Sequence, residues 1–392
     1  MNRKLKTVLC AVLVLLLMFS CCCVSFADEP MPVTVKAKAA VLMDVDSGKV
    51  LMSMNADEKL YPASVTKIMT LLLVTEALDS GKISLSDTVT ASASAASKGG
   101  SQIWLKEGEQ MTVDDLLKAT AVYSANDACT ALGELLAGSD EAFTAMINER
   151  AGQLGMKNTH FDNCTGLDDT TTTHLTTAMD VAIMSRELLK HERIMNYTTI
   201  WMDSLRGGAT ELVNTNKLVR FYKGTTGLKT GTTAKAGCCV SASAKRGNTH
   251  LIAVVMGSQT SDDRFNGAKA MLNWGFANYS TVTPEIDPLL ITDVAVIGGV
   301  VDSIHPSLPK AASVLVKKGE EGKIKTDVEL CVDVQAPVEK GQVLGKVVLS
   351  LGDEKIGEYN IVSPDAVRAL TFKDIFLSLI HISEPTRPLY IS

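Results

Sequence analysis

The 392-residue sequence has few aromatic residues and no excess of positive charge. Aromatic side chains make up 5% of it, and 38 Lys and Arg residues stand against 44 Asp and Glu residues, a net charge of -6. The missing basic excess argues against nucleic acid as a partner. With 46% hydrophobic and 21% charged residues, the chain is neither disordered nor collagen-like. Its length favours two globular domains with cores of their own.

Apolar runs long enough to span a membrane are absent after the N-terminal segment. That segment has a basic start around Arg3, an apolar run over residues 8–19 and small residues at Ser25 and Ala27. This order is typical of a secretory signal peptide, so we expect residues 1–27 to be removed and the mature chain to be exported. An uncleaved membrane anchor is the alternative.

The mature chain also lacks a disulfide framework and a metal-ligand motif. Its cysteines are odd in number and include no Cys-x-x-Cys pair, and its histidines do not have the His-Glu-x-x-His spacing. We therefore expect no metal and no cofactor, with most thiols buried as small apolar side chains. The residues concerned are Cys129, Cys164, Cys238, Cys239, Cys331, His160, His174 and His191.

Hydrophobic periodicity predicts an α+β domain over residues 28–280. A hairpin at the start and strands over residues 228–257 flank a helical block, and a helix closes the domain, so both chain ends supply the sheet. Its elements are predicted at 39–44, 49–52, 64–78, 113–123, 125–136, 140–154, 177–191 and 268–276.

Pro284 and Pro288 mark the boundary to a second, β-rich domain predicted over residues 285–370. Five short β-rich runs alternate there with Gly and Pro turns, at 293–297, 313–316, 328–334, 345–350 and 355–361. Residues 377–392 match one translated frame of a transposase-based sequencing adapter, and we expect them to be foreign to the natural protein.

Ser64 and Lys67 form a Ser-x-x-Lys motif at the start of a predicted helix. Residues three apart on a helix share one face, so the amine lies within reach of the hydroxyl and can serve as its base. Backbone N–H groups at a helix start also point toward an oxyanion. The motif alone is a weak signal, because Ser307 and Lys310 repeat it around a proline that disfavours a helical turn.

Two further motifs follow in order, Ser124-Ala125-Asn126 and Lys229-Thr230-Gly231. The ordered triple resembles the motifs of penicillin-recognising serine enzymes. Flanking residues, among them Tyr61-Pro62-Ala63 and Thr232-Thr233, narrow the resemblance to the low-molecular-weight D-alanyl-D-alanine carboxypeptidases, a family of serine peptidases and penicillin-binding proteins. The resemblance implies a β-lactamase/transpeptidase-like catalytic domain and a small all-β C-terminal domain. In that family an amphipathic membrane-binding helix usually follows.

The resemblance assigns roles to the matching residues. Ser64 would form an acyl-enzyme with the penultimate D-Ala and Lys67 would take its proton. Ser124 would relay a proton to the leaving amine, and Asn126 would hold Lys67 and the substrate amide. Burial and the charge of Lys229 would both lower the pKa of Lys67.

The third motif would bind substrate. Lys229 and Thr230 suit its terminal carboxylate, and Gly231 lets the strand approach the bound peptide. The N–H groups of Ser64 and Thr232 would form an oxyanion hole. Arg264 has two readings, a surface ion pair or carboxylate binding, and Thr215 stands where some relatives carry an arginine.

The implied function is removal of the terminal D-alanine from peptidoglycan stem pentapeptides at the bacterial cell wall, on the outer face of the cytoplasmic membrane. Implied partners are those peptides and β-lactams as covalent inhibitors, with peripheral membrane contact through a missing C-terminal segment. The alternatives are a serine β-lactamase and a non-catalytic wall-binding homologue. No Glu-x-x-Leu-Asn lies between Asn126 and Lys229, and all motif residues are intact, so the carboxypeptidase is favoured.

Overall fold

The computed structural model describes residues 31–308, 313–374 and 376. The predicted signal peptide, the adapter-like residues 377–392 and Lys310 of the second Ser-x-x-Lys lie outside the described residues. Within the described part of the chain, no helix has the length and apolarity needed to cross a membrane.

A five-stranded antiparallel sheet, in the order β2-β1-β9-β8-β7, divides the first part of the molecule into two layers. Both chain segments supply it, as predicted. Every residue of β1 is buried, because alternate side chains enter different cores on the two faces of the sheet. The strands are β1 (Ala39–Asp44), β2 (Val50–Met54), β7 (Thr225–Thr233), β8 (Gly237–Arg246) and β9 (Thr249–Ser258).

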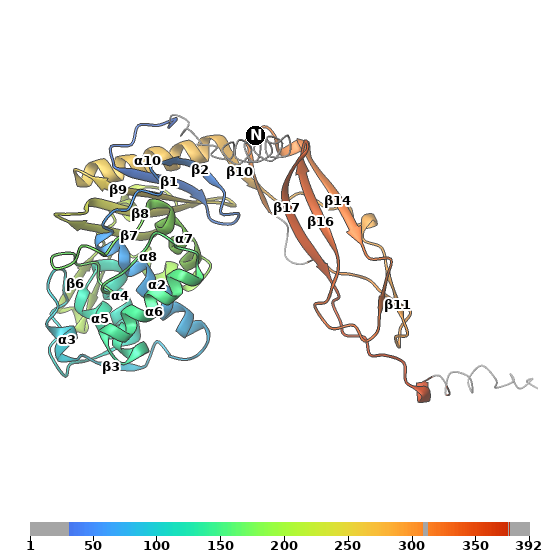
Figure 1. Ribbon diagram of the computed structural model, residues 1–392, viewed down its shortest axis with the longest axis horizontal. Helices are drawn as coiled ribbons and strands as arrows, with labels where there is room; N and C mark the ends of the chain where they lie inside the picture. Colours follow the sequence, from blue (N-terminus) through green and yellow to red (C-terminus); the bar gives the residue numbers. More distant parts are fainter. Residues whose placement is uncertain (1–30, 309–312, 375, 377–392) are drawn as a thin grey trace, which may run out of the picture.

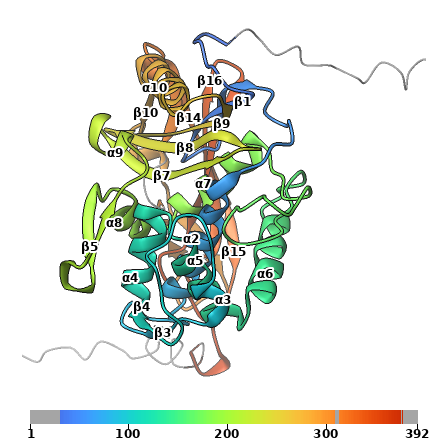
Figure 2. The same ribbon diagram turned by 90° about the vertical axis from the view of Figure 1, so that its left-hand side faces the viewer.

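One face of the sheet carries α10 (Ser261–Asn278) and the other carries the helical block (Figure 2). The centre of the block is α2 (Lys67–Asp79), which is buried on nearly all sides, as its apolar sequence requires. Around it lie α4 (Val113–Lys118), α5 (Asn126–Ala137), α6 (Asp140–Gln153), α7 (Ala178–Leu189) and, toward the edges, α3 (Ala93–Ala96) and α8 (Met195–Thr198). The short helix α9 (Leu218–Phe221) lies beside β7 and packs Leu218 into the core on the α10 side of the sheet.

Three predicted helices differ from the structure at their ends. The helix predicted from residue 64 begins with a 3-10 turn, η1 (Ala63–Thr66), in which Ala63 has a φ of 48°. The helix predicted to 123 ends in a π-helical turn, η2 (Ala119–Tyr123). Helix α10 begins seven residues before the predicted position, since Thr260 caps it through the N–H of Asp263 and its first turn is too polar to show a periodic pattern.

The prediction missed several short strands, which are too brief to show a period. They are β3 (Thr88–Thr90), β4 (Gln110–Thr112), β5 (Met202–Leu205), β6 (Thr210–Val213), β10 (Tyr279–Val282) and β12 (Ser303–Ile304). The first four form two antiparallel pairs, β3 with β4 and β5 with β6.

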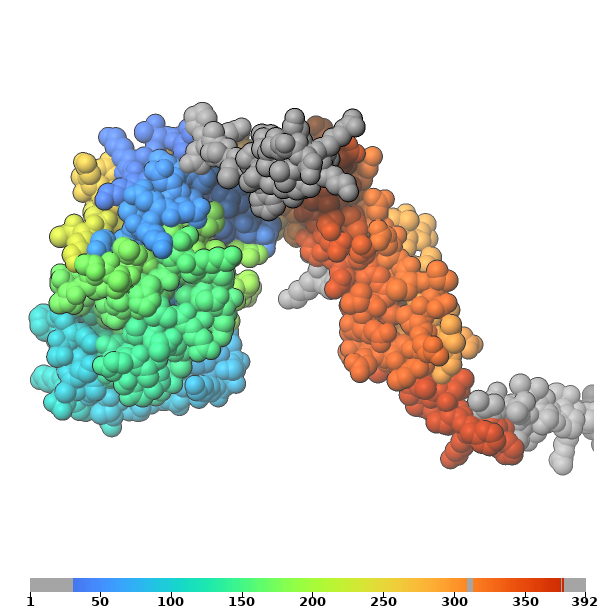
Figure 3. All heavy atoms as spheres, in the orientation of Figure 1, coloured from blue at the N-terminus to red at the C-terminus, as the bar shows by residue number. Residues whose placement is uncertain are grey.

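The C-terminal part is all β and extends beside the first part (Figures 1 and 3). Strand β10 follows α10 directly and pairs with β13 (Val314–Lys317), so the connection is hydrogen-bonded. The remaining strands are β11 (Val294–Ile297), β14 (Ile324–Leu330), β15 (Asp333–Gln335), β16 (Val343–Leu351) and β17 (Glu354–Val362). The run predicted at 328–334 is two strands, β14 and β15. The predicted fold class is confirmed.

A substitution at Gly133 of α5 tests the packing of the helical block. A Cβ there would lie 2.3 Å from Cδ1 of the fully buried Phe143, so we expect Gly133→Ala to lower the free energy of unfolding by about 1–3 kcal/mol through overpacking. The matched control is Gly152→Ala in α6, where a Cβ meets nothing within 4 Å and should be neutral or stabilising. Denaturant unfolding measures both, and equal effects would contradict the packing.

Candidate active site

Ser64 and Lys67 meet at the start of α2 as the motif predicts. Ser64 lies in η1, Lys67 is the first residue of α2, and the amine Nζ is 2.9 Å from Ser64 Oγ. The Lys67 side chain is fully buried. A buried amine is therefore in hydrogen-bond contact with the hydroxyl in the free protein, which is the geometry that a serine and its base require.

Burial lowers the pKa of Lys67 from its ordinary value of 10.5 to about 8, with Asp127 among the groups that oppose the shift. Burial acts in this way because a charged amine loses its hydration in the interior. The sequence also predicted a contribution from the charge of Lys229. Instead, the repulsion is felt at Lys229, whose pKa is held well below its usual range by burial first and by Lys67 second.

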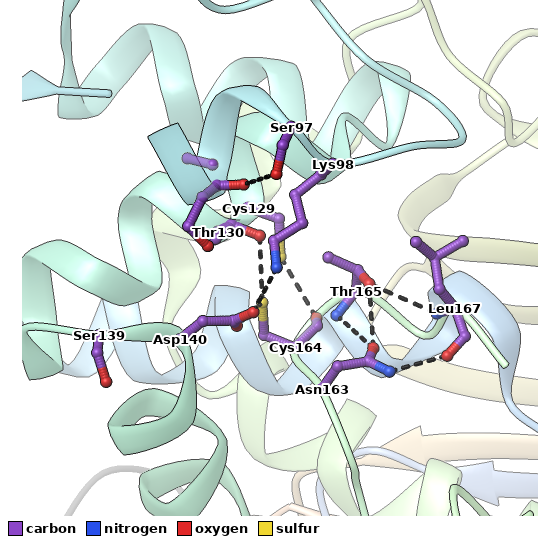
Figure 4. A network of polar contacts seen from close by, with 12 residues as sticks. Ser97, Lys98, Cys129, Thr130, Ser139, Asp140, Asn163, Cys164, Thr165 and Leu167 are labelled. Carbon is purple, nitrogen blue, oxygen red and sulfur yellow. Dashed lines mark hydrogen bonds and ion pairs between the residues drawn. The ribbon is translucent and has the colours of Figure 1, made fainter. Parts of the chain in front are cut away.

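The second partner of Lys67 is a backbone carbonyl that the sequence did not reveal. Lys67 Nζ donates to Thr165 O at 2.7 Å. Asn163 holds the turn that presents this carbonyl, accepting from the N–H groups of Thr165 and Gly166 and donating to Leu167 O (Figure 4). Any residue has such a carbonyl, so no residue type at position 165 signals this function.

Two buried thiols lie directly behind this turn. Cys164 O accepts from Thr70 Oγ1 of α2 and from Cys129 Sγ of α5, and a Lys98–Asp140 ion pair covers the same network (Figure 4). The cysteines of the described residues are free. All but the exposed Cys331 are buried, which confirms the expectation for most of them.

The second motif follows the π-helical turn η2. Ser124 has a φ of 68°, in the left-handed region, and α5 begins at Asn126. Asn126 accepts no bond from Lys67: its Nδ2 donates to Gly99 O at 2.6 Å, and its buried Oδ1 has no partner among the described residues. The expectation that Asn126 holds Lys67 is therefore not met, and its free oxygen remains for a ligand.

The third motif lies on β7, which packs against η1, the turn that carries Ser64. A Cβ at Gly231 would lie 2.7 Å from Pro62 O and 2.9 Å from Ser64 N. Glycine is thus required here because β7 approaches η1 closely. The sequence had predicted a different reason, a close approach of the strand to a bound peptide. Lys229 and Thr230 are buried, and Thr230 Oγ1 donates to Thr215 Oγ1 at 2.7 Å.

Arg264 reaches β7 from α10 and is buried. Its Nη1 donates to Gly231 O at 2.9 Å, to Thr232 Oγ1 at 2.8 Å and to Cys239 O at 3.2 Å. Among the described residues no carboxylate forms an ion pair with it, so the surface ion-pair interpretation is wrong. Burial lowers the pKa of its guanidinium, and the charge stays uncompensated beside the third motif.

His174 contacts η1, the turn that carries Ser64, through Thr66. Its Nδ1 accepts from the Asp162 N–H, so Nε2 carries the proton and donates to Thr66 Oγ1 at 2.9 Å. Thr66 Oγ1 in turn donates to Ala63 O. Burial lowers the pKa of His174 to about 4. Within the described residues no three potential ligands gather as a metal site, and the role of His174 is structural.

Comparison with known proteins matches both parts of the chain. A family model described as D-alanyl-D-alanine carboxypeptidase matches residues 25–260, and one of the penicillin-binding protein 5 C-terminal domain matches residues 287–369. The D-alanyl-D-alanine carboxypeptidase DacF of Bacillus subtilis is 41% identical over 376 residues, which cover 95% of this chain and 96% of that protein. DacC of Escherichia coli, also a D-alanyl-D-alanine carboxypeptidase, is 37% identical over 84% of each chain.

Solved structures agree with these matches. Penicillin-binding protein 5 from Haemophilus influenzae superposes with a TM-score of 0.73 at 33% identity, covering 87% of this chain and 100% of that chain. Penicillin-binding protein D2 from Listeria monocytogenes, in its cefotaxime-bound form, superposes with a TM-score of 0.58 at 31% identity, covering 62% of this chain and 98% of that chain.

Burial of Lys67 has a consequence for stability that can be measured. Between pH 8 and its unfolded value of 10.5, the folded amine binds fewer protons than the unfolded one, so stability rises with pH in this window. We expect unfolding free energies of the wild type to gain up to about 3 kcal/mol relative to Lys67→Met across it. Lys245→Met, at an exposed position, is the control. Parallel pH curves for the wild type and Lys67→Met would contradict a depressed pKa.

Proposed function

Because this chain belongs to the D-alanyl-D-alanine carboxypeptidase family of serine peptidases, we propose that it removes the terminal D-alanine from peptidoglycan stem pentapeptides. The reaction passes through an acyl-enzyme on Ser64, and β-lactams acylate the same serine. The observation that carries the proposal is the 2.9 Å contact between Ser64 Oγ and the buried amine of Lys67, because it supplies nucleophile and base together.

The reaction begins with attack of Ser64 Oγ on the carbonyl carbon of the penultimate D-Ala, while Lys67 takes the hydroxyl proton. The peptide C–N bond then breaks, and the leaving amine of the terminal D-Ala receives a proton relayed by Ser124. Water hydrolyses the resulting ester, which restores Ser64 and releases the shortened peptide. Only a neutral amine can start this sequence, and the pKa of about 8 for Lys67 makes a useful fraction neutral near neutral pH.

Binding residues surround the scissile bond. The partnerless Oδ1 of Asn126 suits the substrate's amide N–H. Lys229 and Thr230 receive the terminal carboxylate, and Arg264 adds an uncompensated positive charge beside them. This arrangement supports carboxypeptidase specificity, since the buried guanidinium of Arg264 favours a free C-terminal carboxylate.

The N–H groups of Ser64 and Thr232 would stabilise the tetrahedral oxyanion. Tight packing of β7 on η1 at Gly231 supports this assignment because it holds the two donors on adjoining segments. In comparable acyl-transfer sites, loss of one donor costs roughly 3–4 kcal/mol.

The remaining assignments concern export and domain organisation. We propose cleavage of residues 1–27, action at the cell wall on the outer face of the cytoplasmic membrane, and peripheral membrane contact through a C-terminal segment. Domains at 28–280 and 285–370 are supported by family models that match 25–260 and 287–369. Strand β10 then joins the two by pairing with β13.

The function is tested by two assays on the same purified chain. We expect covalent labelling by a fluorescent penicillin and release of D-Ala from a diacyl-Lys-D-Ala-D-Ala peptide, with Ser64→Ala abolishing both. Ser307→Ala, in the second Ser-x-x-Lys, should keep both and is the matched control. Labelling without D-Ala release would indicate a non-catalytic homologue, and rapid turnover of the penicillin a β-lactamase.

The role of Lys67 is tested by pH. Because the neutral amine is the base and its pKa is about 8, the rate of penicillin acylation should rise roughly tenfold per unit below pH 8 and level off above it. Lys67→Arg should stay unreactive at every pH, since a guanidinium does not deprotonate. A rate that is flat from pH 6 to pH 9 would eliminate Lys67 as the base.

A further inference from the structure

A groove lies between the loop over residues 99–109 and the β5–β6 hairpin, with a cavity volume of about 680 Å³. Two of its lining residues, Trp104 and Arg206, have φ values of 60° and 53°. Only three other non-glycine residues of the described chain share this left-handed backbone, and two of them, Ala63 and Ser124, belong to the reaction centre. Such strain gathers at functional sites because surrounding structure must maintain it.

Both walls of the groove continue into the active site. On one side, Asn126 donates from its N–H to Ser101 O, and the N–H groups of Ile103 and Leu105 donate to the buried Asp127 carboxylate. Trp104 lies between these two anchored residues. On the other side, the β5–β6 hairpin leads to Thr215, which contacts Thr230 of the third motif.

The chemistry of the groove favours a neutral ligand. The indole of Trp104 is 75% exposed, while Arg206 is fixed by Glu109 at 2.7 Å, by Ile103 O and by Thr210. The groove also carries one Lys and one further Glu, Lys106 and Glu107, so its lining has no excess of formal charge. A strongly anionic or cationic ligand therefore gains little there, whereas a pyranose ring offers C–H faces for the indole and hydroxyl and amide groups for the rim.

We propose that this groove binds a neutral N-acetylated sugar of the peptidoglycan glycan strand, with Trp104 as the stacking surface. The inference rests on the proposed function and deepens it: the reaction centre holds the D-Ala-D-Ala end while the groove holds the glycan to which the stem peptide is attached. Its volume lies in the range of small-ligand sites. Arg206 is a positioning residue that fixes the loop on which Trp104 stands.

The test compares two substrates in the Trp104→Ala variant. One is a glycan-free diacyl-Lys-D-Ala-D-Ala peptide and the other a disaccharide pentapeptide. We expect the ratio of kcat/KM, glycan-linked over glycan-free, to fall about fivefold to tenfold, the scale of one aromatic stacking contact. Trp104→Phe should recover most of it. Phe372→Ala, an 83% exposed aromatic in the C-terminal part, is the control and should keep the wild-type ratio.

Direct binding separates this inference from the proposed function. A disaccharide tripeptide, which lacks D-Ala-D-Ala, should quench tryptophan fluorescence of the wild type and not of Trp104→Phe. If the wild type releases no D-Ala from either substrate, the proposed function fails while the binding assay still decides the groove. An unchanged ratio in Trp104→Ala, or no quenching by the tripeptide, would overturn the inference.

Discussion

The buried amine of Lys67 is the constraint on which the rest of the site depends. A charged amine that is removed from water destabilises the folded protein unless its N–H groups have hydrogen-bond acceptors and its pKa falls so that part of the population is neutral. Two acceptors, Ser64 Oγ and Thr165 O, supply the contacts, and burial lowers the pKa to about 8. On the proposed function, the same burial that destabilises the ammonium ion makes the amine a base, so stability is given up for reactivity at this position.

Satisfying that amine brings distant backbone segments into contact. The turn that contains Thr165 packs on η1 so tightly that a Cβ at Gly166 would lie 1.9 Å from Ala63 O. From the other side, β7 leaves no room for a Cβ at Gly231. Ala63 takes a left-handed backbone conformation between them. The glycines and the strained alanine therefore have one cause, the close packing of three segments around one serine.

Sequence patterns predicted the long, strongly periodic elements and the three motifs. Both depend on residue type, because an apolar face shows as a repeating pattern and the motifs need the side chains of Ser, Lys and Asn. They missed the paired strands of three to four residues, which are too short to show a period, and the start of α10, whose first turn is polar. They also missed the Thr165 carbonyl, since a backbone group has no sequence signature. The setting of Arg264 depended on which face of the sheet α10 covers, and only tertiary structure fixes that.

The cations around the site also couple to one another. Burial first, and then the charges of Lys67 and Arg264, lower the pKa of Lys229. Among the described residues, Arg264 donates to backbone and hydroxyl oxygens and to no carboxylate. On the proposed function, a substrate carboxylate supplies the negative charge that Arg264 lacks and favours the protonated form of Lys229. Recognition of a free carboxylate and protonation of Lys229 are thus coupled, because each charge stabilises the other in a site without water.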